Sequence, residues 1–456
     1  MTQTAAKNQS YADGFLALAQ VLNGHASAGQ APSWAQELRD TAWSTFQRLG
    51  FPTARRGNER WKYTSVRPLA AARFSISLEL DPDSGANIQD VKRLAPWHDD
   101  WTNLVFVDGL FSPELSTGDP INQTAAAGSL ALSLDGNSIV QQHLGRYTGL
   151  DDDGLPALNT AFLRDGAFIH VPRGINAGSV LNLIYLTTPR SQPKAVFPRT
   201  LIVAEPNSSV TINESYVSMS DLGHFTNAVT EIVLEDGVNV EHNQLVNEGA
   251  NAYHVGHTRV HQSQDSAFSS SSFAIGSALA RIDFQVTLNG PGSSCNLDGL
   301  YLTKDSQHVD NLINIDHASP DTTSNLRYKG ILDGNSRAVF GGTVLVRKDS
   351  QKATAHQSDK NLLLSDEAEV DSKPSLLIYA DDVQCGHGAT AGNIDPIALF
   401  YLRSRGLDHE TASKFLIHAF AGEIIQSVTL EPLRDFLDQL FQDELPAASI
   451  KIGVAQ

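Results

Sequence analysis

The sequence predicts a mainly β protein, with a β-solenoid core between helical regions at the two ends of the chain. Along the middle of the chain, short apolar runs rich in β-branched residues, such as 178–186, alternate with polar turn clusters. Segments 201–210 and 231–240 align at a shift of 30 residues, which places Val203 on Val233. Strand–turn–strand units that cannot bury an apolar face alone must stack, so a solenoid is favoured over the competing β-sandwich.

Helical periodicity marks both ends of the chain. Near the N-terminus, apolar residues recur at helical spacing from Trp34 to Leu49. After residue 394 the period returns, and Asp395 with Pro396 forms a good helix start. We therefore expect a mostly helical region at 1–100, a β-helix core at 101–390 and a C-terminal helical region at 391–456.

Two apolar stripes follow residue 408 in the C-terminal region. The stripes consist of Ala412, Phe415, Leu416, Ala419, Phe420 and Ile424, and of Leu433, Phe436, Leu437, Leu440 and Phe441. Each large apolar side chain gains roughly 1.5–3 kcal/mol on full burial, so stripes this complete must cover something. Both the chain's own core and a partner protein remain open as the surface that they cover.

Charge and cysteine content exclude several classes of protein. The net charge is −18, from 51 acidic and 33 basic residues, so phosphate backbones and anionic membranes would repel the chain. Two cysteines provide no disulfide framework and fit a reducing compartment. No segment reaches the roughly 18 consecutive apolar residues of a membrane helix. We expect a soluble, cytoplasmic protein that binds neither nucleic acid nor membrane.

Catalytic signatures are missing from the sequence. It contains no phosphate-binding loop of the Gly-x-x-x-x-Gly-Lys-Ser/Thr type, no Gly-x-Ser-x-Gly elbow and no His-Glu-x-x-His motif. Two thiols cannot supply a four-cysteine cluster site within one chain. The sequence therefore predicts no enzymatic activity and no cofactor-binding or catalytic residues.

Two groups of candidate metal ligands remain. Four histidines lie within twenty residues: His242, His254, His257 and His261. The second group is Cys385-Gly386-His387-Gly388, in which the two ligand types are two residues apart and project from the same face of an extended strand. Soft and borderline donors of this kind suit iron or zinc, and the flanking glycines leave space for another chain or an ion.

Several long runs resemble the SufB/SufD family of iron–sulfur cluster assembly proteins, and within it the SufD branch. The matching runs are 61–63, 329–342, 355–374, 377–390 and 398–406. The resemblance implies a right-handed parallel β-helix with helical segments at both ends. It also implies a non-catalytic scaffold subunit that pairs with a SufB-type paralogue through the β-helices. The C-terminal helices would dock a SufC-type ABC ATPase.

The resemblance also implies a site shared between two chains. SufB-like chains carry a cysteine where this chain has Ser358, and a glutamate where it has Gly388. We therefore expect that this chain binds no cluster stably alone and that iron or a nascent iron–sulfur cluster is shared with SufB. His387 is the expected metal ligand at that interface, and Cys385 is the second. A homodimer when the chain is alone remains open.

Two other functions compete with this interpretation. One is a SufB-like homodimeric scaffold that holds a cluster itself. The other is a polysaccharide lyase of the β-helix class, suggested by acids and arginines on later strands. Those residues are Asp310, Asp316, Asp321, Arg327 and Arg337.

Overall fold

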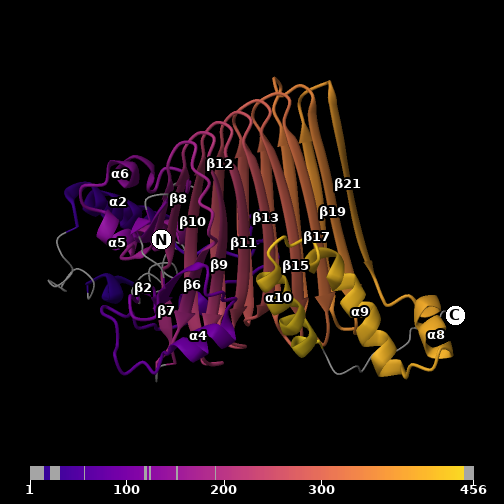
Figure 1. Cartoon of the computed structure of the whole chain (residues 1–456). Helices are drawn as coiled ribbons and strands as arrows, with labels where there is room; N and C mark the ends of the chain where they lie inside the picture. The colour runs from indigo at the N-terminus through magenta and orange to yellow at the C-terminus, as the bar shows by residue number, and fades with distance from the viewer. Residues whose placement is uncertain are drawn as a thin grey trace.

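A solenoid of two facing parallel sheets forms the body of the molecule, with helices around both of its ends (Figure 1). The computed structural model describes residues 15–20, 31–55, 57–117, 121–122, 125–149, 153–189 and 192–445. Residues 1–14 and 21–30 of the predicted N-terminal region, and the last eleven residues of the C-terminal region, lie outside this range.

The first sheet has ten strands. In spatial order they are β2 (Leu110–Phe111), β1 (Thr102–Val107), β6 (Leu181–Thr187), β9 (Ser209–Ser218), β11 (Asn239–Glu248), β13 (Ala267–Gly276), β15 (Ser294–Thr303), β17 (Thr323–Leu332), β19 (Ala353–Leu363) and β21 (Val383–Gly392).

The second sheet faces the first. Its strands are β20 (Glu369–Ile378), β18 (Arg337–Val346), β16 (His308–His317), β14 (Leu279–Leu288), β12 (Tyr253–Gln262), β10 (His224–Leu234), β8 (Arg199–Ala204), β5 (Gly166–Val171), β4 (Ala125–Ser129) and β3 (Ile121–Asn122), and β7 (Lys194–Val196) pairs with β10. From β8 onward, strands of the two sheets alternate along the chain, so each coil there contributes one strand to each sheet. The predicted parallel β-helix is confirmed.

The sequence repeat corresponds to the register of stacked coils. Val203 of β8 pairs with Val233 of β10, and Val210 of β9 pairs with Val240 of β11. The shift of 30 residues between the two similar segments is therefore the length of one coil. Equivalent side chains stack above one another because parallel in-register strands point paired residues to the same face.

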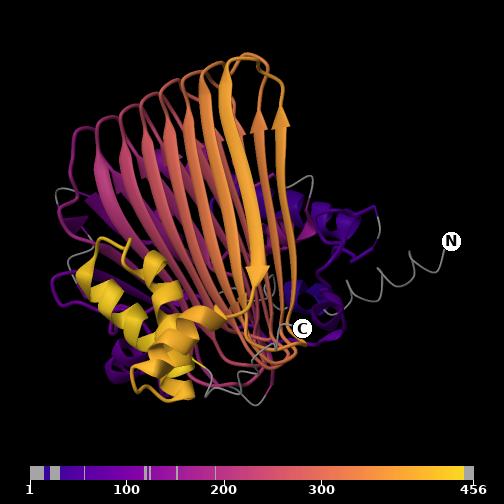
Figure 2. The same cartoon turned by 90° about the vertical axis from the view of Figure 1, so that its right-hand side faces the viewer.

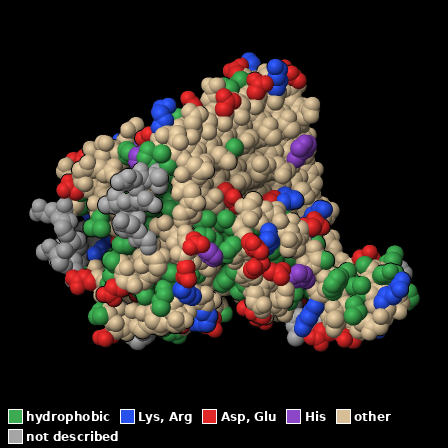
Figure 3. Space-filling view, viewed as in Figure 1, with side chains coloured by type: hydrophobic (Ala, Val, Ile, Leu, Met, Phe, Trp, Pro, Cys, Tyr) green, Lys and Arg blue, Asp and Glu red, His purple; other side chains and the backbone are tan. Residues whose placement is uncertain are grey.

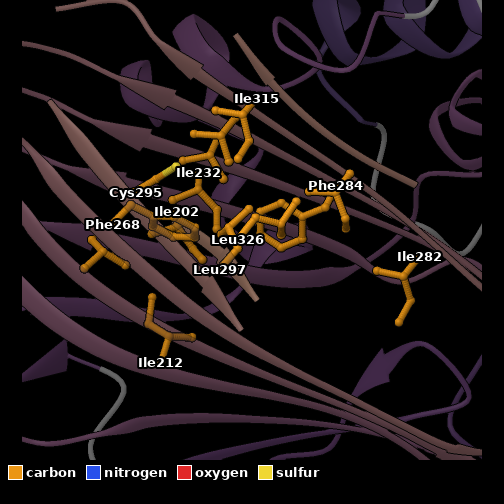
Figure 4. Close-up of a cluster of buried hydrophobic side chains, with 14 of the residues drawn as sticks. Ile202, Ile212, Ile232, Phe268, Ile282, Phe284, Cys295, Leu297, Ile315 and Leu326 are labelled. Atoms are coloured by element: carbon orange, nitrogen blue, oxygen red, sulfur yellow. The ribbon is translucent and has the colours of Figure 1, made fainter. Parts of the chain in front are cut away.

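Apolar side chains from both sheets fill the lumen of the solenoid. Figure 4 shows part of this core, in which Ile202, Ile232 and Ile282 come from one sheet and Phe268 and Leu297 from the other. All of these residues are at most 2% exposed. Successive residues of a strand point to opposite faces, so every second residue of each strand points into the lumen. β-branched and aromatic residues fill these positions well, because they are favoured in strands.

The turns between strands also stack. Gly237 has a φ of 69°, and a Cβ there would lie 2.6 Å from Oδ1 of Asn207 in the preceding coil. Its N–H donates to the carbonyl of Gln264 in the next coil, and Asn207 donates to Asp236 in the same way. A residue that tolerates the left-handed conformation is therefore required at this corner.

Helices cover the N-terminal end of the solenoid. They are α2 (Ser33–Leu49), α3 (Arg67–Ala71), α4 (Ile88–Leu94), α5 (Leu130–Ser133), α6 (Ser138–His143) and α7 (Gly154–Ala161). The loop after α2 docks on the sheet through Trp61, which is 3% exposed and lies 3.8 Å from the guanidinium carbon of Arg281.

Helices α5, α6 and α7 lie within the range 101–390, where the sequence indicated strands. The first two are short, and every residue of α7 is buried, so that helix presents no polar face. An apolar helix without a polar face produces no amphipathic pattern, which is why periodicity did not indicate it.

Three helices follow the last strand: α8 (Pro396–Ser404), α9 (His409–Ile425) and α10 (Glu431–Glu444). Helices α9 and α10 pack on the outer face of the first sheet, where Ile417 and Leu437 contact the cluster that contains Leu300 and Ile331. Lys329 of β17 adds an ion pair of 2.6 Å with Glu423 of α9. The predicted stripe of α10 covers the chain's own core, whereas the predicted stripe of α9 was misplaced: Ala412 and Ile424 are buried, but Phe415 and Ala419 are exposed and Ile417, Ala421 and Ile425 complete the buried face. Among the described helices, none combines the length and apolar character needed to cross a bilayer.

Replacing Phe284 by Ala is expected to lower the free energy of unfolding by about 3–5 kcal/mol, because it leaves a cavity in a close-packed lumen. Denaturant-induced unfolding followed by circular dichroism measures the change. Leu222→Ala, at a side chain that is 53% exposed, serves as the control and should change stability by no more than about 0.5 kcal/mol. Equal effects of the two variants would contradict the assignment of Phe284 to the core.

Candidate functional site

The two ends of the solenoid differ in whether the last parallel strand of each sheet is covered by another strand. At the N-terminal end, short antiparallel pairings of β1 with β2 and of β3 with β4 finish the two sheets. At the other end, β20 and β21 are the outermost strands, and among the described strands each pairs with a single neighbour. Figure 2 faces this end, where the last strands lie open over most of their length. We call the lumen opening there, bounded by β19, β20 and β21, the lumen mouth.

Both predicted ligands lie on β21 at the lumen mouth. Cys385 pairs with Ala355 of β19, and His387 pairs with Gln357. Ala355 and Gln357 are buried in the lumen, whereas the residues between them face outward. In-register parallel strands point paired residues the same way, so Cys385 and His387 also face the lumen side. His387 is nevertheless exposed, because β21 is the last strand of its sheet in the described ranges.

Ser358 and Gly388, the positions at which this chain differs from SufB-like chains, lie on the opposite face of the sheet from Gln357 and His387. Ser358 pairs with Gly388 and lies one position out of phase with the lumen-facing residues. The hydroxyl of Ser358 therefore belongs to the outer face of the sheet. It does not share a surface with His387.

The two cysteines have different surroundings. Cys295 lies in the apolar lumen beside Phe268 and Leu297, and burial raises the pKa of its thiol to about 12 (Figure 4). Cys385 is half-buried, and partial burial raises the pKa of its thiol more modestly. Because the thiolate is the form that binds metal, Cys295 is inert, whereas Cys385 is accessible at the mouth.

A buried carboxylate lies beside these residues. Asp359 occupies the next lumen-facing position of β19 after Gln357, and it is 0% exposed. Its Oδ2 accepts hydrogen bonds from Asn361 at 2.8 Å and from Ser372 of β20 at 2.6 Å. Burial raises the pKa of Asp359 to about 6. Sequence reasoning missed this group, although the alternation along 353–361 could have placed it on the lumen face.

The four clustered histidines do not form one site. His242 contacts Glu214 inside the lumen, and His254 contacts Glu248. His261 packs on Tyr147 outside the sheet. The prediction of a common metal site for these four residues is not supported by their positions.

His257 does lie near two acids that could hold a metal. Ligand atoms of Asp153, His257 and Asp283 lie within 4.8 Å of one another. However, Arg60 and Arg259 contact Asp283 at 2.7 and 2.9 Å and balance the charge of the two carboxylates. A divalent cation there would meet two guanidinium groups, so we interpret this cluster as an ion-pair network that joins the N-terminal loop to the solenoid.

The charged residues that suggested a lyase are also paired and dispersed. Arg327 binds Asp298, Arg337 binds Asp371, and Asp316 binds Arg347, each with a shortest contact of 2.5–2.6 Å. The remaining acids pair in the same manner: Asp310 with Arg281, and Asp321 with Lys352. Asp310, Asp316 and Arg337 lie on the second sheet, Arg327 lies on the first and Asp321 lies in a turn, and each of them is engaged in an ion pair.

A second surface lies on the C-terminal helices. Exposed apolar side chains gather on α8 and the start of α9: Ile397, Phe400, Tyr401, Leu407 and Phe415. Figure 3 shows an apolar area at the position of α8. We call these five residues the α8 patch. Of the two stripes predicted from the sequence, only Phe415 belongs to it.

Comparison with known proteins identifies relatives of the whole chain. Residues 5–183 match the N-terminal region of SufBD proteins, and residues 185–420 match the core domain described as SUF system FeS cluster assembly, SufBD core domain. An iron–sulfur cluster assembly SufBD family protein of Synechocystis is 32% identical over 84% of this chain and 85% of its own. The iron–sulfur cluster assembly protein SufD of Escherichia coli is 31% identical over 88% of this chain and 91% of its own. SufD of Bacillus subtilis is 27% identical over 62% of this chain.

Asp359 is expected to make stability fall as pH rises through about 6, because its raised pKa means that the fold favours the neutral acid. This contribution is fully present below about pH 4 and lost above pH 6. Asp359→Asn removes the free-energy cost of burying an ionised carboxylate, so the metal-free variant should be more stable than the wild type at neutral pH by up to about 3 kcal/mol. Urea unfolding of both proteins across this pH range, with a chelator present, measures the difference. A difference that does not vary with pH would contradict the assignment.

Proposed function

The chain belongs to the SufBD family of iron–sulfur cluster assembly proteins, and from this premise we propose that it is a non-catalytic scaffold subunit. In this proposal it pairs with a SufB-type paralogue through the lumen mouth and recruits a SufC-type ATPase through its C-terminal helices. Iron or a nascent iron–sulfur cluster is the cargo that the two paired chains hold between them.

The uncovered edge of the solenoid is the observation that carries the proposal. Within the described part of the chain, β20 and β21, of ten residues each, leave a row of backbone N–H and C=O groups on their outer edge without a strand partner. Proteins normally shorten, charge or cover such edges, because an open edge invites another strand. Leu377, Ile378 and Tyr379 add exposed apolar surface at the end of β20, with exposed fractions of 44%, 39% and 65%. A second solenoid with a similar edge would pair its backbone groups with those of the edge strand and cover the exposed apolar side chains.

His387 and Cys385 would then be at the seam between the two chains. They face the lumen mouth and lie on the outermost strand, so a partner strand added to β21 would bring its own ligands beside them. One imidazole and one thiol complete only part of a cluster's ligand set. This arrangement supports a shared site over the SufB-like alternative, in which one kind of chain would supply every ligand.

The α8 patch supports recruitment of an ATPase. Aromatic and aliphatic side chains such as Phe400, which is 73% exposed, are the usual anchors of a protein interface. Three of the five patch residues lie on α8, which projects away from the solenoid, while α9 and α10 are held on the first sheet by their buried faces (Figure 1). A partner can therefore bind α8 without disturbing the core of this chain.

His387→Ala is expected to lower the iron and sulfide content of the complex co-expressed anaerobically with SufB- and SufC-type partners, because it removes a ligand from the seam. His356→Ala is the matched control, since His356 is exposed on the neighbouring strand but faces outward. Iron and sulfide are measured chemically after size-exclusion chromatography confirms an intact complex. Unchanged content in His387→Ala would leave this chain a purely architectural partner. A chain that never forms a complex with those partners would refute the proposed function.

Phe400→Glu is expected to weaken binding of the SufC-type ATPase by more than about ten-fold, because it places a charge in the centre of the α8 patch. Pairing with the SufB-type chain should not change. Leu132→Glu, at a side chain that is 81% exposed on α5 near the other end of the solenoid, serves as the control. Titration calorimetry with the purified ATPase measures both variants. Equal affinity for the two would show that the ATPase docks elsewhere.

A further inference from the structure

We propose that Asp359 and Gln357 are oxygen ligands at the lumen mouth and that, with His387, they form an entry site for a single ferrous ion. The inference deepens the proposed function, because it assigns a substrate form, Fe²⁺ before cluster formation, to the surface already described.

The three residues occupy adjacent positions on one face. Gln357 and His387 are paired across β19 and β21, and Asp359 is the next lumen-facing residue on β19. Adjacent strands lie about 4.8 Å apart and alternate residues about 6.6 Å apart. Side chains from these positions can therefore converge on one ion.

Two buried oxygen atoms at this layer lack a hydrogen-bond partner. They are Oδ1 of Asp359 and Oε1 of Gln357, and both residues are at most 4% exposed. The other polar atoms of these side chains are occupied: Oδ2 of Asp359 by Asn361 and Ser372, and Nε2 of Gln357 by the carbonyl of Gly342 at 3.1 Å. These bonds hold the side chains in place and leave one free acceptor on each, which is the arrangement that a cation requires.

The electrostatics also favour a cation over a structural ion pair. Among the described residues, no Lys or Arg forms an ion pair with Asp359, whereas other buried acids of this chain, such as Glu231 and Asp283, contact arginines. Burying a carboxylate without a counter-charge costs stability. A group that costs stability and lies beside an open end is typical of a functional site rather than a structural one.

The donor set indicates which ion binds. A carboxylate oxygen, an amide oxygen and an imidazole nitrogen suit a borderline divalent ion such as Fe²⁺, with open positions left for sulfide or for partner ligands. Cys385 pairs with Ala355, four residues before Asp359 on β19, so the two positions are about 13 Å apart along the strand direction and the thiol is not part of the proposed Fe²⁺ site.

The test uses the full-length chain, purified without metal and titrated anaerobically with Fe²⁺ in equilibrium dialysis. The wild type should bind one exchangeable Fe²⁺, and Asp359→Asn should weaken its binding by about 10- to 100-fold while making the apo-protein more stable. His387→Ala should weaken Fe²⁺ binding similarly. Asp316→Asn, which removes an outward-facing carboxylate that pairs with Arg347, should leave Fe²⁺ binding unchanged.

Absence of Fe²⁺ binding by the wild type, or equal binding by the wild type and Asp359→Asn, would overturn the inference. So would a loss of binding in Asp359→Asn accompanied by lower stability, since that pattern marks a structural residue. The outcome is independent of partner binding. If Asp359→Asn binds Fe²⁺ normally while the co-expressed complex still forms and loads clusters, the inference fails and the proposed function stands.

Discussion

The stacking of coils in parallel register is the constraint on which the rest of this structure depends. Each strand satisfies its backbone groups only through the coil before and the coil after it, so a solenoid has no intrinsic end. Antiparallel strands and helices finish the N-terminal end, where β2 and β3 are two residues each. Nothing comparable covers β20 and β21 among the described residues. The open end is therefore where backbone, apolar surface and candidate ligands are all unsatisfied at once.

The lumen changes character along its length. In the middle it is apolar and closely packed, and it renders Cys295 chemically inert. Where polar groups enter the interior, they are usually matched, as when Glu214 accepts bonds from Thr200 and Thr230. At the mouth, Asp359 keeps a polar atom without a hydrogen-bond partner, as do several buried side chains deeper in the solenoid, such as Gln244 and His254. Asp359 combines such an atom with a carboxylate that forms no ion pair with any described Lys or Arg, and it lies beside the open end.

The C-terminal helices serve the fold and the proposed recognition with different residues. One face each of α9 and α10 is buried on the first sheet, and Lys329 joins that sheet to α9. Helix α8 retains Ile397 and Phe400 on its exposed side. Helix α8 itself packs on α9 through few residues and projects from the solenoid, so a partner could bind it without displacing the helices that cover the first sheet.

The sequence by itself determined the solenoid, the 30-residue coil and the shared face of Cys385 and His387, because alternation and repetition are local properties of a strand. It also indicated the family, through runs that match along most of the chain. Only the tertiary structure decided which end stays open, that the four clustered histidines separate, and that Asp359 lies beside His387. Those outcomes depend on neighbours from other coils, which are set by stacking register rather than by any local pattern. The same reason explains why the stripes of α9 and α10 could not be assigned in advance: amphipathicity shows that a face is covered, but not by what.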